Sequence, residues 1–130
     1  MVAKGYAQRE GIDYNEVFSL VIKHSSIQIL QALVAHYELD LDHLDVKTAF
    51  LHGDLDEKIY MSQPMSFKTV GKENIVCKLK KSLYGLKQSP RQWHKHFNSF
   101  IRGKWYTHSH YDPYVYYNKL PGGEYINLLL

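Results

Sequence analysis

The carboxylate of Asp45 is the side chain with the clearest chemical potential, and it lies in an apolar run from His43 to Leu51. The alternation in this run predicts a strand, which sends Asp45, Lys47 and Ala49 to one face and their neighbours to the other. A carboxylate on such a face can point into a cleft while its neighbours on the other face pack. The run therefore predicts an active centre at Asp45. The alternative is a strand-end carboxylate that binds no metal.

Charge is distributed unevenly around this run, although the net charge of +3 is mild. Acidic residues crowd the stretch that ends at Glu57. A later segment has no acid and carries five cations, Lys78, Lys80, Lys81, Lys87 and Arg91. Cations bind phosphate and carboxylates hold Mg²⁺, so this combination suits an enzyme that holds a nucleic-acid backbone beside a metal site. The alternative is a solvated, lysine-rich strand face.

Hydrophobic periodicity predicts the elements that position these groups. Helical spacing over residues 26–38, with a capping box from Ser25-Ser26 to Gln28, predicts one helix. Ser89 and Pro90 begin a second, which ends near Gly103. Strands are predicted at Tyr60–Gln63, 75–80, Tyr114–Asn118 and Glu124–Leu130, with Gly71 and the Leu120-Pro121-Gly122-Gly123 turn in connections. This order predicts an α+β fold, an antiparallel sheet with helices packed on one face.

Three blocks of this sequence resemble the reverse transcriptase of copia-type LTR retrotransposons, within the Pol polyprotein. They are Val2-Ala3-Lys4-Gly5-Tyr6-Ala7-Gln8 with Gly11-Ile12-Asp13-Tyr14, the segment from Leu44-Asp45-Val46-Lys47-Thr48-Ala49-Phe50-Leu51 to Gln63-Pro64, and the segment from Val76 to Trp93. Leu20 departs from the family, which usually has proline at that position.

The resemblance implies a partial right-hand polymerase, made of fingers and the front half of the palm. Residues 1–130 would form a single partial domain, with about 1–25 a remnant of the fingers and 26–130 palm and fingers with the Asp45 motif. In the family the chain continues into Y-V-D-D, which supplies two more metal-binding aspartates. Because this sequence ends at Leu130, we expect a fragment truncated at both ends.

The resemblance also implies roles for individual residues. Asp45 would bind Mg²⁺, with the Val46 carbonyl as a further ligand. The deoxynucleotide would contact Lys47, Thr48, Ala49, Phe50 and Gly85, and the RNA/DNA primer–template would contact Lys78, Lys80, Lys81, Lys87 and Arg91. Phe50 as an ordinary core residue is the alternative. The implied activity is RNA-directed DNA polymerisation from dNTPs by a two-metal mechanism, for which a single aspartate is insufficient.

Two alternatives to an enzyme remain from the sequence, a noncatalytic nucleic-acid-binding remnant and an inert pseudogene product.

The lack of a long apolar run argues against a membrane span, and the chain is expected to be intracellular, in cytoplasm or nucleus. One cysteine, Cys77, excludes a disulfide framework. His94 and His96 point apart on a helix, which argues against zinc. The apolar strand Glu124–Leu130 predicts self-association through an unpaired edge.

Overall fold

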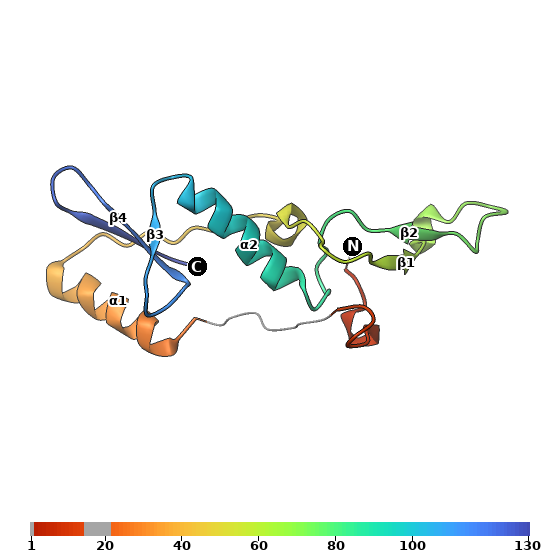
Figure 1. Cartoon of the computed structure of the whole chain (residues 1–130), viewed down its shortest axis with the longest axis horizontal. Coiled ribbons are helices and arrows are strands. Elements are labelled where there is room, and N and C mark those ends of the chain that lie inside the picture. Colours follow the sequence, from red (N-terminus) through yellow and green to blue (C-terminus); the bar gives the residue numbers. More distant parts are fainter. Residues whose placement is uncertain (1, 15–21) are drawn as a thin grey trace. The chain divides into compact units, whose positions relative to one another are not determined.

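The computed structural model describes residues 2–14 and 22–130, so Leu20 lies outside the described residues. The chain divides into two compact units. Unit 1 consists of Met1–Ser19 and Lys47–His96, and unit 2 consists of Leu20–Val46 and Phe97–Leu130. The described residues form a mixed α/β structure with two α-helices and two antiparallel sheets (Figure 1).

Unit 1 is built around a hairpin and the first part of helix α2, Ser89–Arg102. Strand β1, Tyr60–Ser62, pairs antiparallel with β2, Val76–Lys78. Beyond the strands the pairing continues irregularly, since the Ser82 N–H donates to the Gly53 carbonyl at 2.9 Å. Three 3₁₀ helices complete the unit, η1 (Gly5–Ala7), η2 (Ala49–His52) and η3 (Met65–Phe67).

Unit 2 contains helix α1, His24–Tyr37, and a three-stranded antiparallel sheet. The sheet order is β3-β4-β5, with bounds Thr107–His108, Val115–Lys119 and Tyr125–Leu129. Tyr116 of β4 is fully buried, and its ring meets that of Phe97 at 5.9 Å between centroids. The turn between β4 and β5 uses Gly123 at φ +90°, a conformation that glycine adopts without steric cost.

The structure confirms both predicted helices and the four predicted strands, to within one or two residues at most ends. Gly71 lies in the predicted connection at φ +79°. Two other predictions are wrong. The strands form two sheets instead of one among the described residues, and no strand forms between His43 and Leu51, where a segment without regular secondary structure is followed by a turn and then by η2.

The predicted capping box at Ser25-Ser26 is also wrong, because α1 begins at His24, two residues before the predicted start, and its N-cap, Lys23, makes no side-chain cap hydrogen bond. The Ser26 hydroxyl donates instead to Asp112 at 2.6 Å. Asp112 is 2% exposed and also accepts the N–H groups of Lys23 at 3.1 Å and Tyr114 at 3.0 Å. Within unit 2 this carboxylate therefore joins the start of α1 to the segment before β4.

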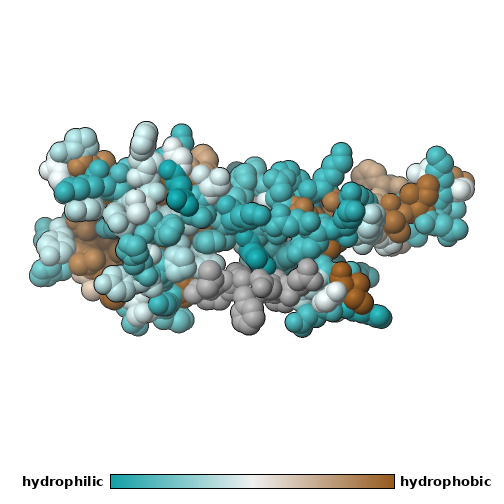
Figure 2. Space-filling model, viewed as in Figure 1, coloured by the Kyte–Doolittle hydropathy of each residue, from teal (hydrophilic) through white to brown (hydrophobic). Residues whose placement is uncertain are grey.

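Strand β5 pairs with β4 and lies at the edge of the sheet within the described part of the chain. Leu129 on this strand is exposed. Hydrophobic residues reach the surface in several other places as well (Figure 2). An apolar edge strand can recruit another chain. Self-association through β5 stays a prediction. No helix among residues 2–14 and 22–130 is long and apolar enough to cross a bilayer.

We expect Asp112→Asn to lower the free energy of unfolding by about 1 to 3 kcal/mol at neutral pH, because an amide nitrogen would face a donor in a buried site. Burial opposes ionisation of Asp112, but the hydrogen bonds from Ser26, Tyr114 and Lys23 outweigh it and lower the pKa of this carboxyl. A lowered folded-state pKa stabilises the fold above the ordinary carboxyl pKa and loses that effect as pH falls through the folded-state value.

Urea unfolding of the wild type and Asp112→Asn at pH 7 and at about pH 3 tests this, and the difference between them should shrink at the lower pH. Glu73→Gln is the matched control, since Glu73 is an exposed carboxylate that accepts the N–H of Gly71 at 2.9 Å. An Asp112→Asn midpoint equal to that of the control at pH 7 would contradict the role given to Asp112.

Candidate functional site

Asp45 and Val46 lie in a segment without regular secondary structure at the end of the first segment of unit 2. Both residues are exposed, and the neighbouring Leu44 is 81% exposed, so the alternating burial that a strand would give is missing. The other predicted site residues, from Lys47 onward, all belong to unit 1. Each group is therefore described within its own unit.

Thr48 turns the chain between Lys47 and η2, and its backbone is strained. Its φ of 56° lies in the left-handed region, which is unfavourable for a β-branched residue by about 1 to 2 kcal/mol. Its hydroxyl donates to the Lys47 carbonyl at 2.7 Å. Strain of this kind persists only where the surrounding contacts hold it.

Phe50, in η2, is half-buried and packs against Tyr84, with 4.7 Å between the ring centroids. This contact brings together two stretches predicted to approach the nucleotide, Lys47 to Phe50 and the loop around Gly85. The two stretches are distant in sequence but meet within unit 1. The same contact is what a packing role for Phe50 would produce, so both interpretations of Phe50 remain open on geometry.

The loop from Tyr84 to Gln88 is held by the N-terminal segment of unit 1. The Ala3 N–H donates to the Tyr84 carbonyl at 2.6 Å. Gln8 then makes two hydrogen bonds, donating through Nε2 to Gln88 Oε1 at 3.0 Å and accepting the Lys87 N–H at 2.9 Å. Gln88 is 1% exposed and donates to the Asp13 carbonyl at 3.3 Å. The loop conformation therefore depends on a pair of amides, of which Gln88 is buried and Gln8 half-buried.

Gly85 is predicted to let the backbone approach a nucleotide closely, and the structure gives it a second reason to be glycine. A Cβ at Gly85 would lie 2.1 Å from the Ala3 carbonyl oxygen, and one at Gly5 would lie 1.7 Å from the Gly85 carbonyl oxygen. Gly85 also has φ +94°. Packing of the N-terminal segment onto the loop thus requires both glycines.

The five predicted nucleic-acid contacts all lie in unit 1 and differ in their surroundings. Lys78 and Lys80 are exposed. Lys81 pairs with Asp54 at 2.5 Å, and this hydrogen bond and charge lower the pKa of the Asp54 carboxyl. Lys87 is half-buried, with its Nζ 3.0 Å from the Tyr14 hydroxyl and 4.8 Å from the Tyr14 ring centre. Arg91 is exposed at the start of α2.

A two-ion Mg²⁺ site needs several converging carboxylates or similar oxygen ligands. Within residues 2–14 and 22–130, no three His, Cys, Asp or Glu side chains are grouped so that they could hold a metal ion. Asp45 is exposed in a segment without regular secondary structure. The described residues therefore do not fit a two-ion site by themselves.

Sequence reasoning gave no role to the amides of Gln8 and Gln88 or to the buried Asp112. Their partners are distant in sequence, with Gln8 and Gln88 separated by 80 positions and Ser26 and Asp112 by 86. Local periodicity carries no signal for such pairs.

A family model described as reverse transcriptase (RNA-dependent DNA polymerase) matches residues 1–127. The chain is 51% identical over its full length to the retrovirus-related Pol polyprotein from transposon TNT 1-94 of Nicotiana tabacum. Over 78% of its length it is 48% identical to that from transposon RE1 of Arabidopsis thaliana, and 45% identical to that from RE2. It spans 10% of the first relative and 7% of each of the others. No solved structure matches the chain.

We expect Gly85→Ala to destabilise unit 1 more than Gly11→Ala. Both residues have positive φ, but a Cβ at Gly11 meets open space while one at Gly85 meets Ala3. Gly11→Ala should therefore cost only the conformational strain, about 1 to 2 kcal/mol, and Gly85→Ala should add displacement of the N-terminal segment. Urea unfolding of the two variants checks this. Equal destabilisation would show that the segment yields freely and does not constrain the loop.

Proposed function

The chain belongs to the reverse transcriptase (RNA-dependent DNA polymerase) family, and from this premise we propose that it forms part of the nucleotide- and nucleic-acid-binding surface of a retrotransposon reverse transcriptase. The resemblance to a copia-type Pol polyprotein is confirmed by the matches to plant transposons. RNA-directed DNA polymerisation from dNTPs is proposed as the activity of the whole polyprotein to which such a segment contributes. Residues 1–25 are proposed as fingers, and 26–130 as palm and fingers.

The contact between Phe50 and Tyr84 is the observation that carries this proposal. It joins the strained turn at Thr48 to the loop that contains Gly85 within unit 1. Successive backbone N–H groups in turns form concave anion sites that suit a triphosphate. Lys47, Thr48 and Ala49 would line the triphosphate, and Phe50 would lie under the sugar of the incoming nucleotide.

Nucleic-acid binding is assigned to the basic segment from Lys78 to Arg91. Lys78 and Lys80 are exposed and make no salt bridge in the described part of the chain. Lys81 is paired with Asp54, but both side chains are exposed, and exposed ion pairs contribute little stability. A phosphate could therefore replace this carboxylate at little cost, whereas Lys87 is engaged by Tyr14.

Asp45 and the Val46 carbonyl are proposed as metal ligands that require further carboxylates from outside the described residues. These 130 residues by themselves should then bind nucleotide and nucleic acid without extending a primer. The noncatalytic nucleic-acid-binding remnant suggested by the sequence would have the same nucleic-acid interface. An inert pseudogene product would lack this interface.

We expect the double variant Lys78→Ala/Lys80→Ala to weaken binding to a primer–template duplex. The slope of log affinity against log salt should also become shallower by about 1.8, because each phosphate that a lysine neutralises contributes about 0.9 to this slope. Lys68→Ala/Lys72→Ala removes the same charge from exposed positions of unit 1 outside the basic segment, and should change the slope much less.

Fluorescence anisotropy with a labelled duplex at several salt concentrations measures both the affinity and the slope. A wild-type chain that binds no duplex at any salt concentration would support an inert product. Equal slopes for the two double variants would mean that overall charge, and not this segment, attracts the duplex.

A further inference from the structure

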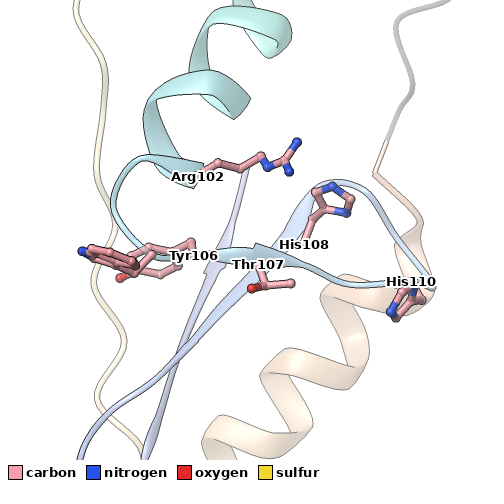
Figure 3. Close-up of a pocket in the computed structure, with 6 residues that line it drawn as sticks. Arg102, Tyr106, Thr107, His108 and His110 are labelled. Carbon is pink, nitrogen blue, oxygen red and sulfur yellow. The ribbon is translucent and has the colours of Figure 1, made fainter.

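The connection from α2 to β3 in unit 2 surrounds a cavity of about 410 Å³. Its lining consists of Arg102, Trp105, Tyr106, Thr107, His108 and His110 (Figure 3). Figure 3 shows the Arg102 and His108 side chains on the same side of the segment that joins the helix to the strand. The volume is within the range of small-molecule sites, about 300 to 1,000 Å³. All of the lining residues except Tyr106 are exposed, so the cavity is open to solvent.

The cavity lining suits an anion. It contains a guanidinium, two imidazoles and two hydroxyls but no carboxylate. Arg102 makes no salt bridge within the described residues. The His108 ring is held edge-on against Tyr116 at 6.3 Å between centroids. An arginine fork can bind two oxygens of one phosphate at once, which makes phosphate a better ligand for it than a simple halide.

Trp105 gives the cavity an aromatic wall at an energetic cost. Its side chain is 87% exposed, so the indole gains little from burial. Its φ of 68° lies in the left-handed region, which costs a bulky residue about 1 to 2 kcal/mol. Two costs at one exposed residue are typical of a side chain held for contact with a ligand. Indole is also a strong stacking partner for nucleobases.

We propose that this cavity binds one nucleotide of a single-stranded nucleic acid, with its phosphate on Arg102 and its base stacked on Trp105. The inference rests on the proposed function and adds a second contact, in unit 2, to the basic segment of unit 1. Lys104 lies next to the cavity, with its Nζ 5.7 Å from the centre of the exposed Phe100 ring. Its ammonium group could contact a neighbouring phosphate of the nucleic-acid strand, next to the bound nucleotide.

An open cavity with cations, donors and an exposed indole fits a strand better than a free nucleotide or an acidic peptide. A free nucleotide would be covered on few sides here, because five lining residues are exposed. An acidic peptide would use Arg102 but would gain little from a stacking surface. A strand uses both, since each nucleotide pairs a phosphate with a flat base.

Binding of a labelled oligothymidine 12-mer to the full chain tests the site by fluorescence anisotropy. Trp105→Gly should lower the affinity about tenfold or more. Glycine accepts the left-handed backbone, so this variant should fold at least as well as the wild type. Arg102→Gln should weaken binding and reduce the salt slope by about 0.7 for one phosphate on a single strand. Tyr111→Ala, which removes an exposed aromatic of unit 2 outside the cavity, is the matched control and should bind normally.

Tryptophan fluorescence provides a second readout that folding alone would not change. The chain has two tryptophans, so in a Trp93→Phe background only Trp105 emits. Oligothymidine should quench this emission, and an abasic 12-mer with the same phosphates should bind more weakly without quenching. Equal affinity of the abasic strand, or a Trp105→Gly variant that binds like the wild type, would overturn the stacking contact.

Two further ligands distinguish a nucleic-acid strand from a free nucleotide and from an acidic protein as the occupant of the cavity. Thymidine monophosphate that quenches Trp105 with the affinity of the 12-mer would show a free-nucleotide site and overturn the strand. A 12-residue polyglutamate peptide that displaces the oligonucleotide from the wild type but not from Arg102→Gln would assign the cavity to an acidic protein. The proposal is supported if thymidine monophosphate binds more weakly than the 12-mer and the polyglutamate peptide does not displace the oligonucleotide.

The two proposals fail separately. Loss of single-strand binding in Trp105→Gly, with normal duplex binding in Lys78→Ala/Lys80→Ala, would support the cavity and contradict the basic segment. The opposite pattern would leave the proposed function in place and overturn the cavity.

Discussion

The hydrogen-bonded amides of Gln8 and Gln88 are the constraint on which the candidate site depends. Gln88 is buried, and a buried amide left without partners costs about 1 to 3 kcal/mol. Here its oxygen accepts from Gln8 and its nitrogen donates to the Asp13 carbonyl. Gln8 also accepts the Lys87 N–H. These bonds fix the loop that presents Gly85 and places Tyr84 against Phe50.

Unit 1 relies on such polar contacts because its core is poor in apolar side chains. Among the described residues of this unit, the buried polar ones, Ser82, Gln88, Ser89 and Gln92, outnumber the buried hydrophobic ones, Tyr14, Ile59 and Leu86. Hydrophobic burial is not directional, whereas hydrogen bonds fix orientation. A polar core therefore stabilises weakly but specifies one geometry of the loops. That balance suits a surface whose function depends on where backbone N–H groups point.

Periodicity in the sequence was sufficient for the elements that pack locally. The stripe of α2 from Trp93 to Ile101 and the run around the buried Tyr116 in β4 report burial on one face, whereas β5 is mostly exposed. The predicted strand at Asp45 failed because no segment pairs with it among the described residues and its side chains stay exposed, so the alternation there corresponds to no buried face. The bond from Ser26 to Asp112 and the Gln8–Gln88 pair could not be predicted from spacing. The roles of Asp45 and Lys47 came from the family resemblance alone, and the cavity at Trp105 gave no sequence signal.

A double-mutant cycle between Gln8→Ala and Gln88→Ala tests the central claim most directly. Urea unfolding of the wild type, both single variants and the double variant gives the coupling free energy between the two side chains. The amide pair predicts a coupling of about 1 to 3 kcal/mol, because Gln8→Ala leaves the buried Gln88 oxygen, and Gln88→Ala the half-buried Gln8 nitrogen, without this partner. The double variant therefore does not lose the sum of the two single effects. A coupling indistinguishable from zero would contradict it, and would mean that the loop from Tyr84 to Gln88 is held by other contacts.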